Sequence, residues 1–167
     1  MVLTPHLLIG AAIGSKFEKT RWLVFLIIAS LFSHYLLDTI PHAEYNVDAL
    51  ADGFNFNFAV AGLKVFWDLF IGLSAVFFLS QKKRNLYFIL IGAIAAILPD
   101  VIIFMSWQID NLNFLNYLVA LGHKIHYPEN SSVALPIGLM TQIIVSFIAV
   151  IILRSKSLLK TTTIRKK

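Results

Sequence analysis

The sequence predicts an all-α fold, a polytopic helical membrane protein with about five transmembrane helices. Of its 167 residues, 58% are hydrophobic and 14% are charged, and its mean hydropathy is +0.78. A soluble domain of this length needs more polar surface. The apolar segments also reach or approach the ~20 residues that cross a ~30 Å hydrocarbon core, and basic residues gather in connections on one side.

The first expected helix is short. Thr4 suits the N-cap and Pro5 suits the first helical position, and the apolar run ends near Phe17. The second runs over residues 22–40 and stops at Pro41, because proline breaks a helix. A polar outer segment follows.

The remaining chain predicts three more spans, over residues 56–80, 86–105 and 133–153, and Pro99 can kink the second of them. Residues 108–132 form a second outer segment, in which an amphipathic interfacial helix is expected. Shifting the chain by 62 residues places HLLIG on DLFIG and Asp38 on Asp100, which suggests two repeated helical hairpins followed by a fifth helix. Residues 1–154 are expected to form one transmembrane domain, and residues 155–167 a basic cytoplasmic tail.

The net charge is +5, and the positions of the basic residues indicate how the chain is oriented in the membrane. Twelve of the fourteen lysines and arginines lie near residues 16–21, at residues 82–84 and in the tail. By the positive-inside rule these positions are cytoplasmic, so the N-terminus is expected outside and the C-terminus inside a cell membrane. We therefore expect membrane lipids as partners and no nucleic acid. No cleavable signal peptide is expected, because the N-terminal segment lacks a basic region.

Ionisable residues interrupt the apolar runs. An ionisable side chain inside a span costs several kcal/mol, so it normally faces a partner or a water-filled cavity. His34 and Asp38 are one helical turn apart on one face, as two ligands of one metal would be. The alternative is a hydrogen bond that joins two helices. The chain has no cysteine, so a metal site must use His and Asp or Glu, which suits zinc, manganese or iron.

The other candidates are expected at the same membrane level, opposite the basic connections. His42 continues the stripe beyond Pro41, and Asp100 has no basic residue near it in the sequence. Asp68 has an alternative as an ion pair with Lys64. All five histidines and all three intramembrane aspartates map to this side: His6, His34, His42, His123, His126, Asp38, Asp68 and Asp100. One metal with a general acid or base, or two metals, can be accommodated.

Three stretches, HLLIGAAIG, LFSHYLLDTIPH and ILPD, resemble the YdjM-type family of membrane-bound metal-dependent hydrolases. They also look distantly like the His/Asp pattern of zinc-dependent phospholipase C enzymes. The resemblance implies metal ligation by His6, His34, Asp38 and Asp100.

Three functions remain open from the sequence. The first is a metal-dependent hydrolase, an enzyme that cleaves a lipid-borne phosphoester or ester at the extracytoplasmic face. There a divalent metal, zinc before manganese or iron, is held by His6, His34, Asp38, His42 and Asp100, and Asp68, His123 and His126 take catalytic roles. The second is a metal-ion or proton-coupled transporter, which the one-sided placement of charge disfavours. The third is a non-catalytic membrane protein with structural His-Asp pairs.

Overall fold

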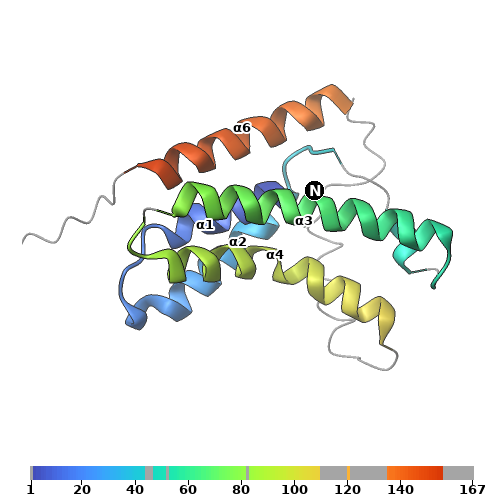
Figure 1. The fold of residues 1–167 in the computed structure, drawn as a ribbon, viewed down its shortest axis with the longest axis horizontal. Coiled ribbons are helices and arrows are strands. Elements are labelled where there is room, and N and C mark those ends of the chain that lie inside the picture. The colour runs from blue at the N-terminus through green and yellow to red at the C-terminus, as the bar shows by residue number, and fades with distance from the viewer. Residues whose placement is uncertain are drawn as a thin grey trace, which may run out of the picture.

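The computed structural model describes residues 2–43, 47–51, 53–81, 83–109, 120 and 135–155. The elements in these ranges are all helical (Figure 1). They are α1 (Leu3–Gly14), η1 (Thr20–Trp22), α2 (Leu23–Asp38), η2 (Asp48–Leu50), α3 (Phe56–Ser80), α4 (Leu86–Gln108) and α6 (Leu135–Arg154). The predicted all-α fold is confirmed. The interfacial helix and most of the basic tail fall outside the described residues.

Within the described ranges, four helices are long and apolar enough to cross a membrane. These spans are Thr20–Asp38, Phe56–Ser80, Leu86–Gln108 and Pro136–Arg154. Large apolar side chains such as Phe66, Trp67 and Phe70 are exposed along α3, as expected for a surface that faces lipid tails and not water. We conclude that this is a membrane protein, as predicted.

The first helix lies at the centre of the bundle. α1 has 12 residues, about 18 Å at 1.5 Å per residue, so it is too short for a full span. It packs against α2, α3, α4 and α6, and its start lies about midway along α3 (Figure 1). Leu7 and Ala11 are completely buried. The predicted first helix is therefore a buried core element surrounded by four full-length helices.

Glycines allow α1 to lie directly against α4. A Cβ on Gly10 would overlap the carbonyl of Gly92 and the side chain of Ala96, and a Cβ on Gly14 would overlap the carbonyl of Phe88. Small residues four apart are typical of such close helix contacts in membranes. Because later residues of α1 meet earlier residues of α4, the two helices run antiparallel, and the start of α1 lies beside the second half of α4.

Side chains from distant parts of the chain hold both ends of α1. Asp68 of α3 accepts hydrogen bonds from the backbone N–H of Leu3, the backbone N–H of Thr4 at 3.2 Å and the Thr4 hydroxyl at 2.6 Å. Asn85 donates to the carbonyls of Ser15 at 2.8 Å and Phe17 at 2.9 Å. These bonds satisfy backbone groups that a helix end leaves unpaired. The helix begins at Leu3, not at Pro5 as predicted, because Asp68 takes the capping role expected of Thr4.

Candidate metal centre

Three helices bring four ionisable side chains together. His6 lies in α1, His34 and Asp38 lie in the second half of α2, and Asp100 lies in α4. Asp38 has one carboxylate oxygen 3.3 Å from Nε2 of His6 and the other 3.1 Å from Nε2 of His34. Asp100 Oδ1 is 3.7 Å from the same His34 nitrogen. The ligand atoms of His6, His34 and Asp38 all lie within 4.8 Å of one another.

Helix length explains why these groups meet. Asp38 is 15 residues beyond the start of α2 at Leu23, and Asp100 is 14 residues beyond the start of α4 at Leu86. At 1.5 Å per residue both carboxylates lie about 21–23 Å from the end of the bundle at which these helices begin. His6 reaches the same level because α1 is antiparallel to α4.

A backbone contact fixes the ring of His34. Its Nδ1 lies 2.8 Å from the carbonyl oxygen of Ala96, so Nδ1 carries the proton and donates it. In the neutral imidazole this leaves the lone pair of Nε2 directed at Asp38 and Asp100. Metal-ligating histidines are commonly oriented by such a carbonyl contact on the second nitrogen. Pro99, three residues beyond Ala96, lies inside α4, and α4 bends partway along its length (Figure 1).

Several buried polar atoms of the cluster have no hydrogen-bond partner among the described residues. They are Nδ1 and Nε2 of His6, Oδ1 of Asp38 and Oδ2 of Asp100. A buried unsatisfied polar atom costs about 1–3 kcal/mol, more for a charged group. His6 Nε2 and Asp38 Oδ1 face each other at 3.3 Å without hydrogen-bond geometry. Ion pairs of Asp38 with His34 and with His6 still leave Nδ1 of His6 and Oδ2 of Asp100 without a partner among the described residues.

A metal ion fits the donor spacing. Four ligands at about 2.0–2.1 Å from a tetrahedral centre are about 3.3 Å apart. Nε2 of His6 and Nε2 of His34 lie 3.3 and 3.1 Å from the two different oxygens of Asp38, and Nε2 of His34 lies 3.7 Å from Oδ1 of Asp100. The ligand atoms of His6, His34 and Asp38 therefore lie close enough together to hold one metal ion, and Asp100 lies beside them.

His6, His34 and Asp38 are buried, whereas Asp100 is partly exposed and forms the open side of the cluster. The side chains of His6, His34 and Asp38 are 0%, 1% and 8% exposed, whereas that of Asp100 is 35% exposed. Tyr35, half-buried, packs the edge of its ring against His34 at 5.4 Å between centroids. Its phenol also lies within electrostatic range of Asp38 and Asp100. Sequence reasoning missed Tyr35, although its position three residues before Asp38 places it on the same side of α2.

The other predicted site residues lie elsewhere. Asp68 caps α1 at Thr4, which lies two residues before His6 in the chain. His42 follows the end of α2, where its Nδ1 lies 2.6 Å from the carbonyl of Ile40. The segment around it is held by α6 through bonds from Thr141 to Pro41 and from Gln142 to Ala43. Neither Asp68 nor His42 joins the three-residue group of His6, His34 and Asp38. His123 and His126 lie outside the described residues.

Comparison with protein-family models, curated proteins and solved structures finds no match for this chain. The chemistry of the site therefore follows from its donor atoms. Two imidazoles and two carboxylates suit Zn²⁺, Mn²⁺ or Fe²⁺, and two carboxylate charges are balanced by one divalent cation.

Proposed function

We propose that this protein is a membrane-embedded, metal-dependent hydrolase that acts on a lipid-borne phosphoester or ester. The observation that carries the proposal is a buried group of His and Asp ligand atoms, several of which have no hydrogen-bond partner among the described residues, with the partly exposed Asp100 beside it. His6, His34, Asp38 and Asp100 would hold one divalent cation, zinc in the first place. When bound, such a cation lowers the pKa of a coordinated water and polarises an ester oxygen.

Other residues orient the ligands, exclude water and contact the substrate. The Ala96 carbonyl holds the His34 ring in one orientation, which fixes the direction of its Nε2 lone pair. Burial of His6 and His34 excludes bulk water from the closed side. Asp100 and Tyr35 border the open side, where the Tyr35 hydroxyl would donate a hydrogen bond to an oxygen of the substrate.

The surroundings of the open side favour a lipid as substrate. Leu36, next to Tyr35, and Val101, next to Asp100, are both exposed on the outside of the bundle. An acyl chain can lie against such apolar side chains, whereas a soluble substrate would have to leave water to reach this depth. We infer that the site serves the extracytoplasmic leaflet, because it lies about 21–23 Å from the basic end of the bundle. Membership in the YdjM-type family, with its hydrolase activity, is part of the proposal.

Elemental analysis of the detergent-purified protein tests the proposal directly. We expect stoichiometric divalent metal in the wild type and its loss in a His34→Gln, Asp38→Asn double variant, whose side chains keep their size. Ser80→Ala is the control. Ser80 is as buried as His34, but it is the last residue of α3 and belongs to the basic end of the bundle. This variant should retain the metal.

The same preparations are then assayed for hydrolysis. Phospholipids and acyl esters are supplied in mixed micelles, and released phosphate, headgroup and fatty acid are followed by ³¹P NMR and chromatography. Activity should disappear with a chelator and return with Zn²⁺. Wild-type protein that holds no metal would contradict the metal centre, and metal-loaded protein that cleaves none of these bonds would contradict the hydrolase.

A further inference from the structure

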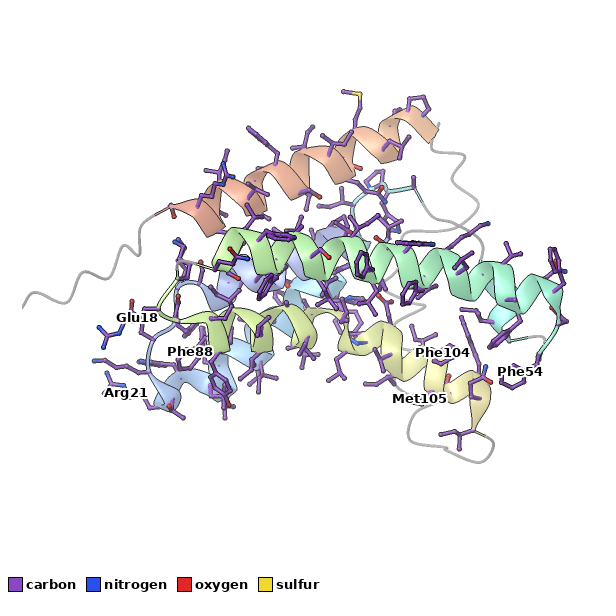
Figure 2. The ribbon with its side chains drawn as sticks, in the orientation of Figure 1. Glu18, Arg21, Phe54, Phe88, Phe104 and Met105 are labelled. Atoms are coloured by element: carbon purple, nitrogen blue, oxygen red, sulfur yellow. The ribbon has the colours of Figure 1, made fainter. Side chains whose placement is uncertain are left out.

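The basic end of the bundle contains two lysines that meet on the last turn of α6. Lys16 follows α1, and its ammonium lies 3.1 Å from the carbonyl of Ile152 and 2.8 Å from the hydroxyl of Ser155. Lys83, from the connection between α3 and α4, lies 2.8 Å from the carbonyl of Ser155. Figure 2 shows Glu18 and Arg21 at this end of the molecule, opposite Phe54, Phe104 and Met105.

One helix end does not balance two ammonium groups. The carbonyls at a helix C-terminus carry roughly half of a negative charge, whereas Lys16 and Lys83 carry two positive charges. Burial and the repulsion of Lys83 lower the pKa of Lys16. The structure thus holds two cations close together with an excess of positive charge.

Both lysines also retain hydrogen-bonding capacity. An ammonium group has three N–H donors. Within the described residues Lys16 uses two of them and Lys83 uses one. The remaining donors and the excess charge suit an anion with several acceptor oxygens, of which a phosphate is the commonest at a membrane surface.

Aromatic residues place this end at the level of the lipid headgroups. Trp22 lies at the start of α2 and Tyr87 in the first turn of α4, and both are exposed. Exposed Trp and Tyr side chains at the ends of spans are typical of the membrane–water interface. A lipid phosphate is therefore the anion nearest to Lys16 and Lys83.

We propose that Lys16 and Lys83, which are held at the end of α6 by Ile152 and Ser155, form a binding site for the phosphate group of an anionic phospholipid. The site is separate from the metal centre and does not depend on the hydrolase function. It would anchor the loops before α2 and α4 and the end of α6 to one lipid headgroup.

Native mass spectrometry of the detergent-purified protein, titrated with phosphatidylglycerol or phosphatidylcholine, tests this site. We expect the wild type to retain phosphatidylglycerol in preference to phosphatidylcholine. A Lys16→Gln, Lys83→Gln variant should bind phosphatidylglycerol about 10-fold more weakly or worse, because charge-assisted hydrogen bonds are lost. The matched control is Lys19→Gln, Arg21→Gln, which removes the same charge from exposed residues of the same end and should bind as the wild type does.

Two further arms keep the test decisive. A Lys16→Arg, Lys83→Arg variant keeps the charge and should retain the lipid, which separates the loss of charge from loosening of α6. Millimolar inorganic phosphate should leave the bound lipid in place. Equal losses in the two glutamine variants, unchanged binding in the Lys16/Lys83 variant, or displacement of the lipid by inorganic phosphate would each overturn the proposal.

Discussion

His34 shows how a single residue is specified at two levels. Its spacing from Asp38 is a property of the helix, so the sequence predicts that the two side chains share a face. Its orientation is set by the Ala96 carbonyl of another helix. His6 comes from a third helix: α1 brings its Nε2 within 3.3 Å of Oδ1 of Asp38, and its Nδ1 has no hydrogen-bond partner among the described residues. The metal hypothesis depends on these atoms and not on the His34–Asp38 pair alone.

Tyr35 offers a test at the scale of one hydroxyl group. Tyr35→Phe removes the proposed hydrogen bond to the substrate and leaves the ring against His34. We expect the metal content to stay the same and kcat/KM for the lipid substrate to fall about 10- to 100-fold, as for the loss of a hydrogen bond to a charged group.

Tyr87→Phe is the control for this change, since Tyr87 is an exposed tyrosine near the basic end of α4. Turnover by Tyr35→Phe at the wild-type rate would remove Tyr35 from the proposed mechanism. Loss of metal from that variant would show instead that the phenol supports the ligands.

At the scale of elements, α1 determines the geometry of the site. It is short, buried and held at its ends by Asp68 and Asn85, and it touches α4 through backbone atoms at Gly10 and Gly92. The sequence predicts a catalytic role for Asp68, whereas its hydrogen bonds to Thr4 hold the start of α1 and so help to position His6. Because α1 cannot slide without breaking these contacts, His6 is kept at the level of Asp38.

A methyl group at the α1–α4 contact should therefore disturb the site. Gly10→Ala places a Cβ on the Gly92 carbonyl, and backbone cannot move aside as a flexible side chain can. We expect a loss of about 1–3 kcal/mol or more of stability, as for other overpacked interiors, together with weaker metal binding. A thermal melt and a metal titration in detergent measure both effects.

The control for this variant lies in α3. Gly62→Ala also adds a Cβ within a helix, but into open space, so its stability should be unchanged or higher, given the better helix propensity of alanine. If Gly10→Ala melts and binds metal as the wild type does, the close packing of α1 is not what positions His6.

At the scale of the whole molecule, the long apolar helices and the basic residues gathered at one end are typical of a membrane protein with two different faces. The long apolar helices establish the membrane, and the clustering of lysine and arginine predicts an outer N-terminus and a cytoplasmic C-terminus. Lys16 and Lys83 also cap α6, so these residues serve packing as well as orientation.

The absence of cysteine from the chain makes the orientation simple to measure. Phe54→Cys, at the end opposite the basic residues (Figure 2), should react in intact cells with a maleimide that does not cross membranes. Lys19→Cys should react only after the cells are permeabilised, because the basic end is predicted to be cytoplasmic. The opposite labelling pattern would invert the topology and move the proposed site to the inner leaflet.

The sequence by itself determined the helices, their membrane character and the shared face of His34 and Asp38. These properties depend on local composition and on the period of the helix, which neighbouring residues specify. The tertiary structure decided that His6 joins that pair, that Asp100 lies beside it, that Asp68 and His42 lie outside the group, and that Tyr35 packs against His34. The contacts responsible join different helices, such as His6 with Asp38, His34 with Ala96 and Gly10 with Gly92. No local pattern specifies such contacts, because they follow from how closely whole helices can pack.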